Sequence, residues 1–395
     1  MTPTERRASA SLALIFALRM LGLFLVLPVF ALEARRLPGG DDPVWVGLAM
    51  GVYGLTQGCL QIPFGMASDR FGRKRVMVIG LVIFALGSLL AALAPSVAWL
   101  ACGRALQGAG AISAAVTALL ADQTRDVVRT KAMALVGASI GLMFALSLVL
   151  SPLLNAWLGL HGLFALTALL ATGGIAVVLW WVPPEPAKHV DAGRGGLRDV
   201  LADAALMRLN AGVFLLHAVQ LAMWVALPAM LVQAGLDKDS HWKVYLPAVL
   251  GSFVVMGMSL FRLERAGYLR AVFLVAIGLI GTVQLGLWVV AQGQPGLLPL
   301  AWLLFVFFCG FNVLEASQPS MVSRLAPASV RGTAMGVYNT LQSLGFFVGG
   351  MAGGWLTKNH GAQGLFAVAA MAMLVWLVIA WPMRQPPLAH AAKAP

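Results

Sequence analysis

Long hydrophobic stretches alternate with short polar connections from one end of the chain to the other. Each stretch holds about twenty residues, and a helix of that length rises by about 30 Å, the thickness of the hydrocarbon core of a membrane. The pattern predicts twelve membrane-spanning helices, over residues 11–32, 44–67, 76–94, 97–120, 131–154, 161–182, 206–233, 242–262, 269–291, 297–324, 331–356 and 362–382. We therefore expect an all-α membrane protein.

A polar segment rich in proline and glycine separates the sixth predicted span from the seventh. It predicts an N-terminal six-helix bundle over residues 1–182, a cytoplasmic linker over 183–205, a C-terminal six-helix bundle over 206–382 and a short cytoplasmic tail over 383–395. An internal repeat supports two related bundles. Arg-Thr-Lys-Ala-Met begins at Arg129 and opens the fifth span, and Arg-Gly-Thr-Ala-Met begins at Arg331 and opens the eleventh. Such repeats let one half of a transporter rock against the other around a site near the midplane.

The composition agrees with a membrane protein and argues against other classes. Of the 395 residues, 60% are hydrophobic and 11% are charged, whereas about a quarter are charged in a typical soluble protein. The net charge of +12 could indicate a nucleic-acid partner, but the basic residues form short clusters between hydrophobic stretches, so we expect none. The three cysteines form no CxxC pair and have no histidine at ligand spacing, so we expect no metal or other cofactor.

The basic residues also predict the orientation of the chain. Twenty of the 27 Lys and Arg residues lie on the same side of the predicted spans as the N-terminus, and five lie on the other side. Because cytoplasmic loops carry the excess of Lys and Arg, both termini are expected in the cytoplasm, in a multi-pass protein of the bacterial inner membrane. The first stretch carries Arg19 and lacks a cleavage site, so it is expected to be a retained span.

Two motifs carry a family resemblance. The connection between the second and third spans reads Gly65-Met66-Ala67-Ser68-Asp69-Arg70-Phe71-Gly72-Arg73-Lys74-Arg75, and the fourth span contains Arg104-Ala105-Leu106-Gln107-Gly108-Ala109-Gly110. The first resembles the signature loop of the major facilitator superfamily, and the second is similar to that family's arginine-and-glycine motif. Within the superfamily the chain resembles the YajR-like group of drug:proton antiporter type, through stretches that begin at Leu18, Tyr53, Gln61 and Gly332. Regulation through the soluble C-terminal domain of that group is not expected here.

The resemblance implies two pseudo-symmetric six-helix bundles that transport a solute by alternating access. It also implies a conformational latch, in which Asp69 faces the start of the eleventh span. A carboxylate is stabilised there because a helix N-terminus has unpaired N–H groups and a partial positive charge. The residues assigned to this latch are Gly65, Asp69, Arg70, Gly72, Arg73, Asp122 and Gly332, with charges linked from Asp69 through Arg73 to Asp122. The alternative is that these charges only mark the topology and anchor the loop.

Glu315 is the one acidic residue well inside a predicted span, and it shares a helix face with Asn312 and Pro319. Ionisable groups inside a membrane are costly and usually face a cavity or a partner, so Glu315 is predicted to bind and release a proton or cation. The alternative is a permanent ion pair with an arginine inside the membrane. His217, in the seventh span, is a candidate for a second titrating group.

Two arginines lie inside predicted spans. The resemblance implies that Arg104 takes part in proton transfer, and the alternative is a structural arginine satisfied by backbone carbonyls. For Arg19, contact with an anionic substrate and pairing with Glu315 remain equal alternatives.

Polar side chains at helical spacing give the candidate substrate cavity, because a polar stripe on a membrane helix is not expected to face lipid. These residues are Tyr53, Gln57, Gln61, Gln107, Gln220, Trp224, Asn312, Tyr338 and Gln342. The alternative is that they hold helices together. Glycine pairs such as Gly47/Gly51 and Gly137/Gly141, and the series Gly345/Gly349/Gly353, are predicted to allow close helix packing.

These features favour a secondary transporter, with proton-coupled efflux of small, partly hydrophobic compounds as the leading hypothesis. Import of a small metabolite and a non-transporting membrane sensor are the alternatives. An enzyme is not expected, since the G-x-S-x-G match at Gly137–Gly141 lies inside an apolar helix instead of a strand-to-helix turn. No phosphate-binding loop is present, so direct use of ATP is not expected. The expected partners are a small solute, protons and the lipid bilayer, and the chain is expected to be a monomer.

Overall fold

The computed structural model describes residues 1–185, 197–327 and 330–383, and these residues form helices and connections without a β-strand. The α-helices are α1 (Pro3–Ala34), α2 (Pro43–Phe71), α3 (Arg73–Ala92), α4 (Val97–Ala109), α5 (Ser113–Asp122), α6 (Asp126–Ala176), α7 (Leu197–Ala202), α8 (Ala204–Gln233), α9 (Trp242–Arg265), α10 (Leu269–Val290), α11 (Leu297–Leu325) and α12 (Arg331–Ala380). A π-helix, η1 (Val177–Trp181), follows α6, and a 3₁₀-helix, η2 (Lys238–Ser240), precedes α9.

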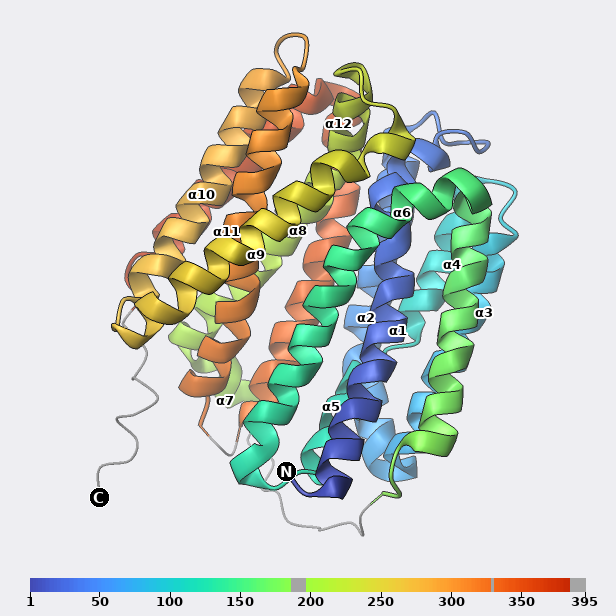
Figure 1. Cartoon of the computed structure of the whole chain (residues 1–395), viewed down its shortest axis with the longest axis vertical. Coiled ribbons are helices and arrows are strands. Elements are labelled where there is room, and N and C mark those ends of the chain that lie inside the picture. The colour runs from blue at the N-terminus through green and yellow to red at the C-terminus, as the bar shows by residue number, and fades with distance from the viewer. Residues whose placement is uncertain (186–196, 328–329, 384–395) are drawn as a thin grey trace.

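Two of these helices each contain two membrane spans. The backbone of α6 breaks at Gly159 with φ 65°, and that of α12 breaks at Gly361 with φ 66°. Glycine adopts positive φ without a steric penalty, which allows a tight turn at each position. Figure 1 shows α6 running to one end of the molecule, turning there and running back. With α4 and α5 together forming one span, the described helices match the twelve predicted spans, and the predicted all-α fold is confirmed.

Eight of the described helices are long and apolar enough to cross a membrane, and the two double helices are among them. α2 and α9 provide the remaining spans. Residues 186–196 of the predicted linker 183–205 and residues 384–395 of the predicted tail 383–395 lie outside the described residues. The described part of the linker contains α7 and the start of α8. The side chains of Arg129 and Arg331, which begin the internal repeat, also lie outside the described set.

Helices α1–α6 lie on one side of the molecule and α8–α12 on the other (Figure 1). We call them the N-terminal and C-terminal halves. Across the boundary, α2 packs against α12 through glycines. A Cβ atom on Gly51 would lie 2.7 Å from the carbonyl oxygen of Phe347, and one on Gly47 would overlap the carbonyl oxygen of Gly350. Small residues therefore let the two backbones approach closely, as the spacing predicted.

A second glycine face of α12 packs inside the C-terminal half. Cβ atoms on Gly345 and Gly349 would overlap the backbone of α8, and one on Gly353 would lie 2.8 Å from the Cα atom of Ala222. The prediction for Gly137 and Gly141 is wrong, because a Cβ atom on either residue meets no atom within 4 Å. These two glycines lie in the first part of α6, where the helix has open space beside it.

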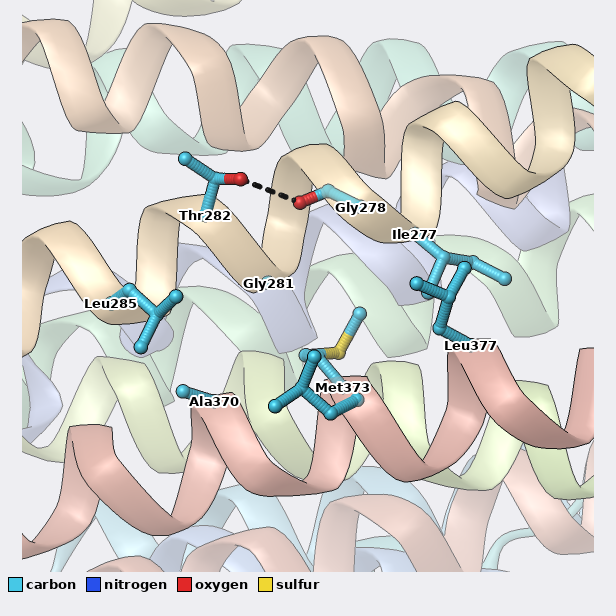
Figure 2. A pocket seen from close by; sticks show the side chains of 9 residues that line it. Ile277, Gly278, Gly281, Thr282, Leu285, Ala370, Met373 and Leu377 are labelled. Carbon is cyan, nitrogen blue, oxygen red and sulfur yellow. Dashed lines mark hydrogen bonds between the residues drawn. The ribbon is translucent and has the colours of Figure 1, made fainter.

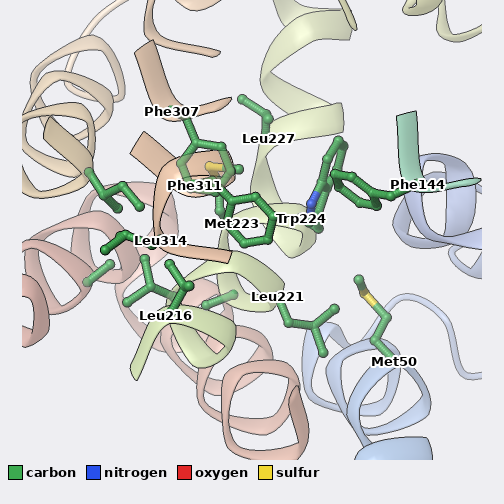
Figure 3. Close-up of a cluster of buried hydrophobic side chains, with 14 of the residues drawn as sticks. Met50, Phe144, Leu216, Leu221, Met223, Trp224, Leu227, Phe307, Phe311 and Leu314 are labelled. Carbon is green, nitrogen blue, oxygen red and sulfur yellow. The ribbon is translucent and has the colours of Figure 1, made fainter. Parts of the chain in front are cut away.

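Aromatic side chains fill the interior where the halves meet, and Figure 3 shows them with Phe144 of α6 reaching toward Phe311 of α11. The ring centroids of Phe144 and Phe311 are 6.0 Å apart, and those of Phe24 and Phe144 are 5.1 Å apart. Trp224 and Met50 are buried in the same cluster. The cluster therefore joins helices of both halves.

Candidate functional site

Three polar side chains from three helices meet inside the C-terminal half. Oε2 of Glu315 on α11 lies 3.3 Å from Nε2 of His217 on α8. The side-chain nitrogen of Gln342 on α12 lies 2.8 Å from the same Nε2 and 3.5 Å from Oε1 of Glu315. We call Glu315, His217 and Gln342 the central triad.

The hydrogen bonds of His217 fix where its protons sit. Nδ1 lies 2.8 Å from the carbonyl oxygen of Val213, and a carbonyl can only accept, so Nδ1 carries a hydrogen. In the neutral ring Nε2 then has a lone pair, which can accept from the amide of Gln342. Nε2 has a single lone pair, so it can accept either from Gln342 or from a protonated Glu315, and an Nε2 that carries a hydrogen would instead donate to Glu315.

Exposure differs sharply within the central triad. The His217 side chain is 2% exposed, whereas that of Glu315 is 37% exposed although it lies in the middle of α11. The rings of Phe311 and Phe346 pack edge-on against the imidazole, with centroid distances of 6.1 and 4.8 Å. Part of the Glu315 side chain is therefore exposed, whereas its Oε2 atom and the imidazole of His217 are buried.

Arg19 on α1 is buried within the N-terminal half and bonded to two other spans. Its guanidinium donates to the hydroxyls of Ser113 and Tyr53, at 3.2 and 3.0 Å, and to the carbonyl oxygen of Gly110 at 3.2 Å. That carbonyl lies at the break between α4 and α5, where it also accepts from the backbone N–H of Ile112 at 2.9 Å. In this conformation these bonds of Arg19 stay within the N-terminal half and Glu315 contacts His217, so pairing of Arg19 with Glu315 stays a prediction.

Arg104 on α4 is also buried, at 5% exposure. It donates to the side-chain oxygen of Gln107 at 3.0 Å and to the carbonyl oxygen of Met50 at 3.4 Å. Its guanidinium carbon lies 4.9 Å from the centre of the Tyr53 ring, a favourable cation–π contact. Tyr53 therefore contacts both buried arginines, with its hydroxyl on Arg19 and its ring face on Arg104. A role for Arg104 in proton transfer stays a prediction.

The predicted cavity residues differ in how exposed they are. Gln342 belongs to the central triad, and Gln57 on α2 is partly exposed. Gln61, Gln107, Gln220 and Trp224 are buried. Substrate contact by any of these residues stays a prediction.

Two further candidates make contacts between helices. The amide of Asn312 donates to the hydroxyl of Ser252 at 2.8 Å, which joins α11 to α9. The hydroxyl of Tyr338 lies 3.5 Å from the side-chain oxygen of Gln318, between α12 and α11. These contacts fit the alternative that part of the polar set holds helices together.

The signature loop contains a continuous chain of charges. Nη1 of Arg73 lies 2.6 Å from Oδ1 of Asp69, and its Nε lies 3.3 Å from Oδ2 of Asp122. Gly72 joins α2 to α3 with φ 100°, a conformation that favours glycine. Arg70 stacks on the ring of its neighbour Phe71, with its guanidinium carbon 5.4 Å from the ring centre.

The other half of the predicted latch lies at the start of α12. A Cβ atom on Gly332 would meet no atom within 4 Å, and one on Gly65 would lie 3.4 Å from the side chain of Ala114 in its own half. A contact between Asp69 and the start of α12 stays a prediction. This contact is expected in a conformation in which this end of the molecule is closed.

Sequence reasoning missed Glu185, which caps α3. Gly72 is the N-cap residue and has no side chain to accept from the first turn of the helix. The carboxylate of Glu185 instead accepts from the backbone N–H groups of Arg73 and Lys74, at 3.1 and 2.7 Å. The available signal was a glycine N-cap followed by a basic cluster. It does not identify Glu185, because this residue lies more than a hundred positions further along the chain.

It also missed two ion pairs that cross from one half to the other. Glu33 of α1 pairs with Lys238 of η2, and Asp42, just before α2, pairs with Lys358 of α12 at 2.6 Å. We call the end of the molecule that carries these four residues the Glu33 end. The opposite end, which carries the signature loop, is the Arg73 end.

A shallow hollow of about 210 Å³ lies between α10 and the second part of α12 (Figure 2). Its lining is almost wholly apolar, and its one hydroxyl, on Thr282, is bonded to the carbonyl oxygen of Gly278. Binding sites usually combine apolar walls with a few convergent polar groups. This hollow lacks such groups, so the central triad is the better candidate site. Among the residues described, no group of three His, Cys, Asp or Glu side chains is arranged to hold a metal ion.

Comparisons with known proteins agree with this geometry. The family model of the Major Facilitator Superfamily matches residues 12–350 and 263–394. The chain is 45% identical over 392 residues to the inner membrane transport protein YajR of Escherichia coli (strain K12), covering 98% of this chain and 85% of that protein. It is 28% identical over 381 residues to the multidrug resistance protein MdtH of Aeromonas salmonicida, covering 93% and 90% of the two chains.

Solved structures show the same fold at low sequence identity. A variant of the nucleoside transporter NupG superposes with a TM-score of 0.76 at 14% identity, covering 95% of this chain and 99% of that one. A bacterial homologue of the human lysosomal transporter Spinster, in an inward-facing and occupied conformation, gives 0.72 at 14% identity, covering 98% of each chain. Members of this family are transporters and not enzymes. The chain belongs to the major facilitator superfamily.

Proposed function

We propose that the protein is a proton-coupled secondary transporter that exports small, partly hydrophobic compounds from the bacterial cytoplasm by alternating access. The observation that carries this proposal is the central triad, in which a partly exposed glutamate side chain in the middle of a membrane helix turns one buried carboxyl oxygen toward a buried imidazole.

The triad explains how protons and substrate compete. An ionised carboxylate inside the membrane is costly unless a proton or a cation accompanies it. When the halves enclose Glu315, its carboxyl group must therefore carry a proton, share the His217 proton, or contact a positively charged group of the substrate. Binding of a proton on one side and of substrate on the other then gives exchange.

The aromatic cluster supports a hydrophobic part in the substrate. Phe311 lies next to His217, and Phe144 and Phe24 continue the aromatic surface into the N-terminal half. The name of the relative MdtH points in the same direction, toward drug-like compounds. The solute thus contacts both halves, as alternating access requires.

The packing of α2 on α12 supports a conformation open at the Arg73 end. Glycines near the Glu33 end would overlap the partner backbone if they carried a Cβ atom, whereas a Cβ atom on Gly58 would lie 3.3 Å from the side chain of Leu344. Further along, Gly332 and Gly336 have open space. With both termini in the cytoplasm, as the basic residues predict, this is the inward-open conformation. In the outward-open conformation Asp69 engages the start of α12.

Purified protein in liposomes tests the proposal. A substrate gradient directed out of the lumen should drive protons into the lumen, whichever way the protein is inserted, and an imposed pH gradient should drive uphill substrate movement opposite to the proton flux. A panel of lipophilic compounds, first selected by their thermal stabilisation of the protein, supplies the substrates. Solute flux that does not change under any imposed pH gradient would exclude proton coupling. Flux of solute and protons in the same direction would indicate import.

A further inference from the structure

Glu33 is a nearly buried carboxylate, 8% exposed, that is held by donors from both halves. Within the N-terminal half it accepts from Arg36 at 3.2 Å and from the amide of Asn155, near the turn of α6, at 3.1 Å. From the C-terminal half it accepts the ammonium group of Lys238. Of these bonds to Glu33, only the one from Lys238 crosses the boundary and must break when the halves separate at this end.

Asp42 makes a second bond across the same boundary. Its Oδ1 accepts from the backbone N–H of Val44 and caps α2, and its Oδ2 accepts from Lys358 of α12 at 2.6 Å. The ammonium group of Lys358, and after it the Val44 N–H, lowers the pKa of Asp42 below its usual value. The carboxylate is thus ionised across the neutral range and available to pair.

We propose that the pairs Glu33–Lys238 and Asp42–Lys358 form a gate that holds the Glu33 end closed and opens once in each transport cycle. This inference rests on the proposed function, because a gate has meaning only in an alternating-access cycle. Both pairs lie at the end where α2 and α12 pack most tightly, and each joins one half to the other.

The arrangement keeps the cost of opening low. A buried carboxylate that loses its only partner is strongly destabilised. Glu33 does not lose all its partners, because Arg36 and Asn155 move with it in the N-terminal half. Asp42 likewise keeps its helix cap when Lys358 leaves. Both carboxylates therefore stay compensated in the open conformation, which suits a contact that breaks repeatedly.

The gate is connected to the central triad through α6. Asn155 and Phe144 lie on the same helix, eleven residues apart in the sequence, and Phe144 packs on Phe311, which contacts His217. A movement of α6 that takes Asn155 away from the boundary also withdraws Phe144 from the aromatic cluster. Opening the gate therefore opens the path to Glu315 from that side.

The alternative is that the two pairs only stabilise the connections at this end of the molecule. Arg36 separates the two explanations, since it binds the same carboxylate as Lys238 but from the same half. If the pairs are only local supports, loss of either base should have the same effect. If they form a gate, only loss of Lys238 should favour opening.

Distance measurements on the full-length protein in lipid nanodiscs test this directly. Cys59, Cys102 and Cys309 are first replaced by alanine, and spin labels are attached at the exposed positions Arg35→Cys and Gln233→Cys, one in each half. Lys238→Gln should raise the ratio of long to short distances by roughly three- to tenfold, as for a partly buried ion pair. Lys358→Gln should raise it less, by up to about fivefold, because Lys358 is exposed. Lys238→Arg should stay close to the unmodified protein, and Arg36→Gln should not shift toward long distances.

A double variant tests the pairing itself. Glu33→Gln combined with Lys238→Gln should open the Glu33 end no further than Lys238→Gln alone, because both changes remove the same bond. Equal distance distributions for Lys238→Gln and Arg36→Gln, or full additivity in the double variant, would overturn the gate. The readout needs no transported solute. If the unmodified protein carries no solute in liposomes, the proposed function fails while the distance result still decides whether the pairs control opening.

Discussion

Nε2 of His217 lies 3.3 Å from Oε2 of Glu315, and the two residues come from different helices of the C-terminal half. Nδ1 of the same ring donates to the backbone carbonyl of Val213, so Nε2 is the ring nitrogen that faces both Glu315 and Gln342.

Replacement of Glu315 tests this relationship. Glu315→Gln keeps the shape of the side chain but replaces its carboxyl group by an amide, which cannot bind and release a proton. Uphill transport driven by a pH gradient should therefore fall at least about a hundredfold, as expected for loss of an essential proton carrier. Exchange of labelled for unlabelled substrate should persist within about tenfold. Glu315→Asp is the matched control, and it should retain partial coupling. Unchanged uphill transport by the Gln variant would show that coupling occurs elsewhere.

The contact between α2 and α12 should tolerate no side chain at Gly51. A Cβ atom there would lie 2.7 Å from the carbonyl oxygen of Phe347, and overpacking of this kind costs about 1–3 kcal/mol. Gly51→Val should lower the melting temperature in detergent and abolish transport. Gly257→Val on α9, where a Cβ atom meets nothing within 4 Å, provides the control and should keep most of the transport activity. Similar losses in both variants would contradict this account.

Tyr53 should contribute through its hydroxyl and its ring separately. Tyr53→Phe removes the bond to Arg19 but keeps the ring on Arg104, so the loss of stability should be about 0.5–1.5 kcal/mol, or more if Arg19 is left with an unpaired donor. Tyr53→Leu should lower the melting temperature further because the cation–π contact is lost as well. Equal melting temperatures for the two variants would show that the ring face contributes nothing.

Because of the Asp42–Lys358 pair, the fraction of molecules closed at the Glu33 end should decrease at acidic pH. The pKa of Asp42 is lowered in this structure, mainly by Lys358. The contribution of Asp42 to the stability of the closed Glu33 end is therefore present above the usual carboxyl pKa and is lost as pH falls through the lowered pKa. On titration from about pH 7 to about pH 3, the labelled protein should therefore open at the acidic end of the range.

Asp42→Asn isolates that effect, because asparagine is a good helix cap without a charge. This variant should be more open at neutral pH and should lose the acidic transition that Asp42 contributes. Asp41→Asn, at an exposed neighbouring position, should retain both the closure and the transition. A transition that survives unchanged in Asp42→Asn must arise from another group.

Asp69 should stabilise the conformation closed at the Arg73 end. Asp69→Asn removes the charge that is expected to face the start of α12 and also weakens its bond to Arg73. Labels across the Arg73 end should then report a larger open population, and transport should slow by about tenfold, as for loss of one charged contact of about 1.4 kcal/mol. Wild-type rates with an unchanged distance distribution would leave Asp69 with only a local role in its loop.

Much of the architecture follows from local sequence patterns. The predicted span over 269–291 corresponds to α10 at Leu269–Val290, and that over 206–233 corresponds to α8 at Ala204–Gln233. Hydrophobic length and polar breaks are properties of neighbouring residues, so they can be read along the chain. The break of span four at Gly110 was not predicted, because one glycine among apolar residues does not reveal that a buried arginine will bond to its carbonyl.

The sequence by itself determined the twelve spans, their two sets of six, and the types of residue available for chemistry inside the membrane. It singled out Glu315 because a carboxylate is costly there, whatever its neighbours. Only the tertiary structure decided that its partner in this conformation is His217, and that Glu33 meets Lys238 from the other half. Such pairs join residues about a hundred to two hundred positions apart, and their geometry comes from how helices pack, which the periodicity of one helix does not encode.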